Sequence, residues 1–157
     1  MNNIRVLVVD DHDIVRYGIC SVLKSSADVD VVGEASNGVE AVSKFEELNP
    51  DVMLLDISMP EMNGIETTRT IIKKYPDARI LILTMHLNEE YLNQVLSAGA
   101  SGYILKNTEI GEMLNAIRSV AKGKQIFSDP ISSIMTEKYV RSAQYGADHK
   151  DSGMPNL

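Results

Sequence analysis

Five short runs of apolar and β-branched residues recur along the chain, and each predicts a β-strand. The runs are Arg5–Val9, Val29–Gly33, Val52–Leu55, Arg79–Leu83 and Gly102–Leu105. The segments VLVV, VMLL and ILIL are apolar throughout and do not alternate with polar residues. This pattern is typical of parallel strands that are covered on both faces. It therefore predicts a sheet buried between two layers.

The segments between these runs repeat their apolar residues every three or four positions, which predicts amphipathic helices. The stripes are Val15, Ile19, Val22 and Leu23; Ala41, Val42, Phe45 and Leu48; Ile65, Thr68, Ile71 and Ile72; Tyr91, Leu92, Val95 and Leu96; and Ile110, Met113, Leu114, Ile117 and Ala121. Asn37-Gly38 and Asn63-Gly64 mark two helix starts. Alternating strands and helices predict a doubly wound α/β domain with a five-stranded parallel sheet. The natural order for five strands is the flavodoxin-like 2-1-3-4-5.

The pattern changes after Phe127, where the predicted α/β domain, 1–127, ends. The remaining stretch, 128–157, begins with apolar residues at helical spacing and continues after Ser142 as AQYGADHKDSGMPNL. The first part fits one more amphipathic helix. The second part is rich in Gly, Asp, Ser and Pro, and it fits a flexible linker. A tail that frays is an equally good interpretation of this composition.

Length and charge narrow the class of protein. The chain has 157 residues, about one domain, and a formal net charge of −7. This charge argues against direct binding of nucleic acid by the segment, because phosphates require basic partners. The single cysteine, Cys20, excludes an internal disulfide and fits the apolar face of a helix. No signal peptide or membrane-spanning run is evident, so we expect a cytoplasmic protein with no membrane partner.

Carboxylates follow two of the predicted strands at their carboxyl ends. Asp10 and Asp11 follow VLVV, and Asp56 ends VMLLD. In the order 2-1-3-4-5 the winding reverses between strands one and three, and ligands bind in the crevice at that point. Because neighbouring carboxylates cannot all stay ionised at low cost, such a cluster requires protons or a cation. Oxygen ligands in a small site favour Mg²⁺.

Two other strand ends supply what a phosphoryl group needs. LILT ends in Thr84, a hydroxyl donor, and GYILK ends in Lys106, a mobile cation. With the three acids, these side chains can bind a metal, provide a carboxylate nucleophile and balance transferred charge. Each residue alone has an ordinary explanation as a cap, a β-former or a solvated charge, but their shared position favours a site. Beside the cluster, we expect Asp13 to be a turn or cap residue near the start of the first helix and His12 to point outward.

Four motifs carry a family resemblance: VVDDH, LLDISMPEMNG, LTMH and GYILK. In order and spacing they resemble the receiver domain of bacterial two-component response regulators, over Ile4 to Phe127. The segments DDHDIVRYGI and ASGYILKN resemble the NarL/FixJ (LuxR-type) branch of that family. Members of this branch usually continue through a linker into a DNA-binding helix-turn-helix domain.

The resemblance implies a role for each matched acid. Asp56 would be the phosphoacceptor, and Asp11 and Asp56 would bind Mg²⁺ directly. Asp10 would contact the metal through water, and Ser58 would offer its main-chain carbonyl. Lys106 would pair with Asp56 and, after transfer, with the phosphoryl group. Mg²⁺ and the lysine would neutralise charge during a loose transition state.

The resemblance also implies a conformational switch made of Thr84 and Tyr103. Thr84 would bond to a phosphoryl oxygen and move inward, which would free space for the Tyr103 ring. Two positions depart from the commonest family pattern. Met85 is bulkier than the usual small residue and could restrict access to the phosphoryl group. Asn107 replaces the usual proline, which leaves the isomer of the preceding bond open.

The function implied is that of a signalling switch which catalyses its own phosphorylation and dephosphorylation. The expected partners are a sensor histidine kinase, a second copy of the chain after phosphorylation, and DNA through a helix-turn-helix domain beyond Leu157. A single-domain phosphoryl shuttle or interaction module without DNA output is the alternative, and we favour a receiver taken from a longer DNA-binding regulator. A phosphohydrolase is disfavoured, because Ser58 stands where such an enzyme commonly has a second acid.

Overall fold

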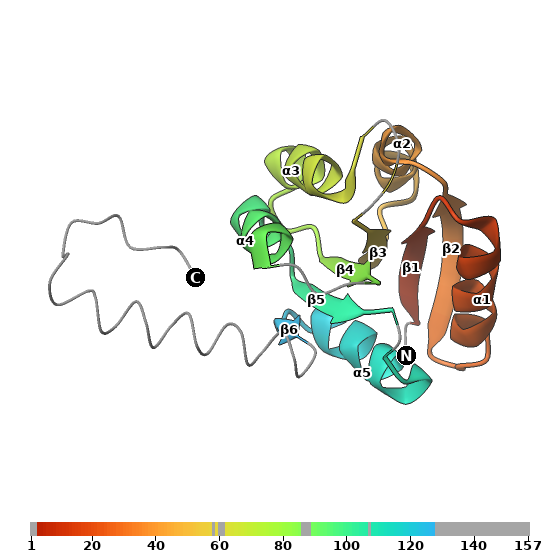
Figure 1. The fold of residues 1–157 in the computed structure, drawn as a ribbon. Helices are drawn as coiled ribbons and strands as arrows, with labels where there is room; N and C mark the ends of the chain where they lie inside the picture. The colour runs from red at the N-terminus through yellow and green to blue at the C-terminus, as the bar shows by residue number, and fades with distance from the viewer. Residues whose placement is uncertain (1–2, 58, 60–61, 86–88, 107, 128–157) are drawn as a thin grey trace, which may run out of the picture.

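The structure is a computed structural model that describes residues 3–57, 59, 62–85, 89–106 and 108–127. Strands and helices alternate along this part of the chain (Figure 1). The elements are β1 (Ile4–Val9), α1 (Asp13–Lys24), β2 (Val29–Ala35), α2 (Gly38–Leu48), β3 (Val52–Asp56), α3 (Gly64–Lys74), β4 (Ile80–Thr84), α4 (Glu89–Ala98), β5 (Gly102–Leu105), α5 (Ile110–Ala121) and β6 (Ile126–Phe127). The predicted helix and the linker or tail after residue 127 lie outside the described residues.

The strands form one parallel sheet in the order β2-β1-β3-β4-β5-β6. The predicted order of the first five strands and the doubly wound fold are confirmed. The prediction of five strands missed β6, because a run of two residues is too short to give a sequence signal. Gly102 allows this strand to approach, since a Cβ atom there would lie 2.5 Å from the carbonyl oxygen of Ile126.

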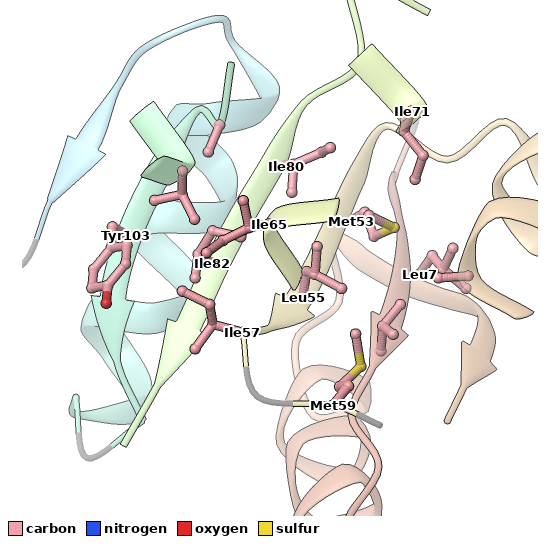
Figure 2. Close-up of a cluster of buried hydrophobic side chains, with 14 of the residues drawn as sticks. Leu7, Met53, Leu55, Ile57, Met59, Ile65, Ile71, Ile80, Ile82 and Tyr103 are labelled. Atoms are coloured by element: carbon pink, nitrogen blue, oxygen red, sulfur yellow. The ribbon is translucent and has the colours of Figure 1, made fainter. Parts of the chain in front are cut away.

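Two apolar cores cover the two faces of the sheet, as the continuous apolar runs predicted. One core packs α2, α3 and α4 against residues such as Leu7, Met53 and Tyr103, which Figure 2 shows in close-up. The other packs α1 and α5 against alternate strand residues such as Val8 and Leu54. Figure 1 shows the same division of the helices between the two sides of the sheet.

The first residues of the helices fix the ends of the loops that follow the strands at the carboxyl end of the sheet. Asn37 and Asn63 are N-caps whose side chains accept hydrogen bonds from Glu40 N at 2.8 Å and from Glu66 N at 2.9 Å. The prediction that Asp13 caps α1 is wrong, because the N-cap is His12, which makes no side-chain cap bond. None of the helices in the described ranges has the length and apolar character needed to span a bilayer.

Candidate functional site

Three carboxylates converge at the carboxyl ends of β1 and β3. The two strands pair directly, with Val9 opposite Leu55, so the acids that follow them become neighbours. One oxygen each from Asp10, Asp11 and Asp56, together with a ring nitrogen of His12, all lie within 4.8 Å of one another. The structure therefore brings together the acids that the strand pattern placed at the switch point.

A buried ammonium group lies beside two of these carboxylates. Lys106, the residue after β5, places Nζ 2.7 Å from Asp10 Oδ2 and 3.4 Å from Asp56 Oδ2. The side chains of all three residues are less than a tenth exposed, at 7% for Lys106, 1% for Asp10 and 5% for Asp56. One ammonium balances one of three neighbouring carboxylates, so the cluster retains a negative potential that attracts a cation.

Asp11 provides the test of whether a cation fits. Its Oδ1 atom is buried and has no hydrogen-bond partner within the part of the chain that the structure describes. His12 Nδ1 lies 3.1 Å from this oxygen without the geometry of a hydrogen bond. A buried, unpaired carboxylate oxygen is costly unless a cation or water binds it. With oxygens from Asp10 and Asp56, the donor set fits a hard divalent ion.

Backbone contacts hold the loop that carries the first two acids. Asp10 accepts a hydrogen bond from His12 N at its Oδ1, at 2.8 Å, and its own N donates to Ala35 O, at 3.1 Å. The His12 side chain is 65% exposed, in line with the expected outward direction. Its Nδ1 nevertheless lies 3.3 Å from Asp10 Oδ1, so the ring also covers the acids.

Thr84 and Tyr103 lie on adjacent strands beside the acids. Thr84 ends β4 and is 5% exposed, whereas Tyr103, in β5, is fully buried. The Tyr103 hydroxyl makes no hydrogen bond to any described residue. Burial raises the pKa of Tyr103, and the nearby Thr84 side chain partly offsets this rise without reaching hydrogen-bond geometry. Figure 2 shows the ring projecting from β5 at the edge of the cluster of core side chains.

The loop after Asp56 is closed by a tight contact with α3. Gly64 N donates to Ile57 O at 3.0 Å, and a Cβ atom at Gly64 would lie 2.8 Å from the main-chain oxygen of Asp56. The proposed carbonyl ligand Ser58 lies outside the described residues, as does Asn107. Met85, which follows Thr84, is 64% exposed at the rim.

One buried cation beside the site, Arg16, was not anticipated from the sequence. It lies in the first turns of α1 and is 9% exposed. Its neighbours Val15 and Tyr17 are exposed, so the local pattern resembles the solvated face of a helix. The burial of Arg16 becomes evident only in the folded structure, where its hydrogen-bond partners surround it.

Comparison with known proteins identifies the family. The family model of the response regulator receiver domain matches residues 6–118. The chain is 37% identical to the transcriptional regulatory protein DegU of Brevibacillus brevis, over 89% of this chain and 59% of DegU. It is 38% identical to the response regulator protein VraR of Staphylococcus aureus, over 90% of this chain and 68% of VraR. The chain thus spans less than two thirds of the length of DegU.

A solved structure agrees with these matches. The crystal structure of a LuxR-family two-component response regulator from Aurantimonas sp. superposes with a TM-score of 0.84 at 35% identity, covering 88% of this chain and 99% of that one. The chain therefore belongs to the response regulator receiver domain family, within its NarL/FixJ (LuxR-type) branch.

Proposed function

We propose that Asp56 is the phosphoacceptor of this receiver and takes its phosphoryl group from a sensor histidine kinase. The observation that supports this role most directly is the position of Asp56. Its carboxylate ends β3 within the acid cluster and lies 3.4 Å from Lys106 Nζ. A carboxylate next to a fixed cation and two further acids is suited to accept a phosphoryl group with its charge balanced.

The resident metal in this proposal is Mg²⁺, held by Asp11 and Asp56 directly and by Asp10 through water. The main-chain carbonyl of Ser58 would complete the protein ligands. The unpaired Oδ1 of Asp11 supports this assignment. When bound, Mg²⁺ would neutralise and orient phosphoryl oxygens.

The chemical step needs no proton from the protein. An oxygen of Asp56 forms a bond to phosphorus while the P–N bond of the kinase phosphohistidine breaks, and the histidine nitrogen keeps the electron pair. Lys106, already within ion-pair distance of Asp56, balances the charge that arrives. The Thr84 hydroxyl then donates a hydrogen bond to a phosphoryl oxygen. Together with Tyr103, Thr84 acts as the switch that changes the surface recognised by a partner. Hydrolysis of the acyl phosphate resets the protein, so it behaves as a switch rather than a turnover enzyme.

The output of the complete protein is transcriptional control in this proposal. DegU is named a transcriptional regulatory protein, and the Aurantimonas relative belongs to the LuxR family. We propose that residues 1–127 form the receiver and that 128–157 lead as a helix and linker to a DNA-binding domain. Phosphorylation would favour a homodimer. The cytoplasmic location stays a prediction.

Incubation with Mg²⁺ and acetyl phosphate tests the proposal. Mass spectrometry should find one added phosphoryl group on the wild-type chain and none on Asp56→Asn. Asp77→Asn is the matched control, since this exposed residue precedes β4 at the opposite end of the sheet and its variant should be phosphorylated normally. A folded wild-type chain that stays unmodified, or an Asp56→Asn chain that gains the same mass, would contradict the proposal.

A further inference from the structure

Arg16 connects three segments of the fold through three different nitrogens. Nη1 donates to the main-chain oxygen of Asp10 at 2.7 Å. Nε donates to Glu34 Oε1, at the end of β2, at 3.0 Å, and Nη2 donates to Asp13 Oδ1 at 2.8 Å. The guanidinium thus ties the turn after β1 to the neighbouring strand and to the start of α1.

The fold keeps this cation charged although its side chain is only 10% exposed. Burial alone would lower the pKa of Arg16, but hydrogen bonds and charge pairing with Asp13 and Glu34 raise it overall. Two carboxylates therefore compensate the buried charge. The third contact, to the Asp10 carbonyl, adds nothing to charge pairing and fixes the position of the backbone instead.

That carbonyl belongs to the peptide plane between Asp10 and Asp11. Because a peptide unit is rigid and planar, holding its oxygen also sets the direction in which the following residue leaves. The preceding peptide is held as well, since Asp10 N donates to Ala35 O, next to Glu34 in β2. The turn that carries two acids of the cluster is thus anchored to β2 from both sides, once directly and once through Arg16.

We infer that Arg16 is a positioning residue, which holds the Asp10–Asp11 turn so that its carboxylates are already arranged to bind the divalent cation. This inference rests on the proposed function of the same site. Arg16 touches neither the metal nor the phosphoryl group and acts through Asp10. Lysine cannot replace it, because a single ammonium cannot reach three partners in the fixed directions of a guanidinium fork.

Calorimetric titration of the full chain with MgCl₂ tests the inference by comparing Arg16→Lys with wild type. Arg118→Lys is the matched control, because Arg118 also forms a fork, to Asp28 and to Ser26 Oγ, at the opposite end of the sheet. Arg16→Lys should weaken Mg²⁺ binding about tenfold, whereas Arg118→Lys should stay within about twofold of wild type. At saturating Mg²⁺, the rate of phosphorylation by acetyl phosphate should return close to the wild-type rate for Arg16→Lys.

An Arg16→Lys chain that loses thermal stability but binds Mg²⁺ as tightly as wild type would overturn the inference, since the arginine would then be merely structural. If this variant does not fold, Glu34→Ala provides the same test, because it removes the oxygen that accepts the hydrogen bond from Nε of Arg16. It should weaken Mg²⁺ binding about threefold, and unchanged affinity would overturn the inference. A wild-type chain that neither binds Mg²⁺ nor accepts phosphoryl would instead refute the proposed function.

Discussion

Lys106 Nζ lies closer to Asp10 Oδ2, at 2.7 Å, than to Asp56 Oδ2, at 3.4 Å. The family resemblance implied that Lys106 pairs with Asp56. The ammonium pairs with Asp56 and also with Asp10, so it bridges two carboxylates from neighbouring strands. In this arrangement the lysine performs part of the charge balance that the acid cluster requires.

Replacement of Lys106 should show how strongly the clustered carboxylates destabilise the fold when their cation is missing. Lys106→Met should lower the free energy of unfolding at pH 7 by about 3–5 kcal/mol, because buried carboxylates lose their cation. Mg²⁺ should restore part of the loss, since it replaces the missing positive charge. Urea unfolding with and without Mg²⁺ provides the measurement. Equal losses in both conditions would show that the lysine stabilises the fold through packing alone.

Two glycines offer a matched test of the loop after the acceptor. A methyl group at Gly64 would lie 2.7 Å from Ile57 Cα and 2.8 Å from the oxygen of Asp56. Gly64→Ala should therefore destabilise the chain by about 1–3 kcal/mol and slow phosphorylation, because the backbone of the acceptor must move. A methyl group at Gly111, in α5, would meet no described atom within 4 Å. Gly111→Ala should raise stability by about 0.5–1 kcal/mol.

Urea unfolding and the rate of phosphoryl mass gain check both glycine variants. A Gly64→Ala chain that matches wild type in both measurements would contradict the predicted close approach. Equal destabilisation of the two variants would show that the effect is general to helical glycines rather than specific to the loop.

The buried hydroxyl of Tyr103 predicts an unusual gain of stability. Removing a polar group that has no partner in the described structure relieves its desolvation cost. Tyr103→Phe should therefore raise the free energy of unfolding by about 0.5–1 kcal/mol. Tyr17→Phe, at a side chain that is 60% exposed, serves as the neutral control in the same urea titration. A clear loss of stability in Tyr103→Phe would mean that the hydroxyl is hydrogen-bonded in solution.

The buried thiol of Cys20 should make the free energy of unfolding depend on pH in the alkaline range. Burial, followed by the nearby charge of Glu34, raises the pKa of its thiol from 9.0 to about 11. The folded chain therefore keeps a proton that the unfolded chain releases between these values. The contribution of the Cys20 thiol to the free energy of unfolding is fully present below pH 9. It is lost as the pH approaches 11, which lowers this free energy by roughly 1–2 kcal/mol. Unfolding of wild type and Cys20→Ala across this range should show a steeper decline for wild type, and parallel curves would refute the assignment.

The sequence allowed the strand order and the acid cluster to be predicted for a common reason. Continuous apolar runs identified buried parallel strands, and the order of such strands determines which of their ends meet. Asp10, Asp11 and Asp56 follow directly from that logic. The Asn-Gly pairs predicted two helix starts equally well, because the Asn side chain bonds locally.

Details that depend on side-chain reach across the fold could not be predicted. Arg16 is buried with a hydrogen bond to Glu34, which lies on another element and gives no local signal along the chain. The preference of Lys106 for Asp10 depends on a distance difference that spacing along the chain does not encode. Asp13 was expected to cap α1, but its carboxylate binds Arg16 instead, within the first turn.

The short strand β6 has a practical consequence for anyone producing a fragment of this protein. The family match ends at residue 118, before β6 begins at Ile126. A fragment cut there would lose the last residues of α5 and leave the backbone N–H and C=O groups of β5 exposed along an open edge. Unprotected strands of this kind pair with other chains and promote aggregation. Fragments that extend through Phe127 should therefore remain monodisperse at concentrations where shorter ones precipitate.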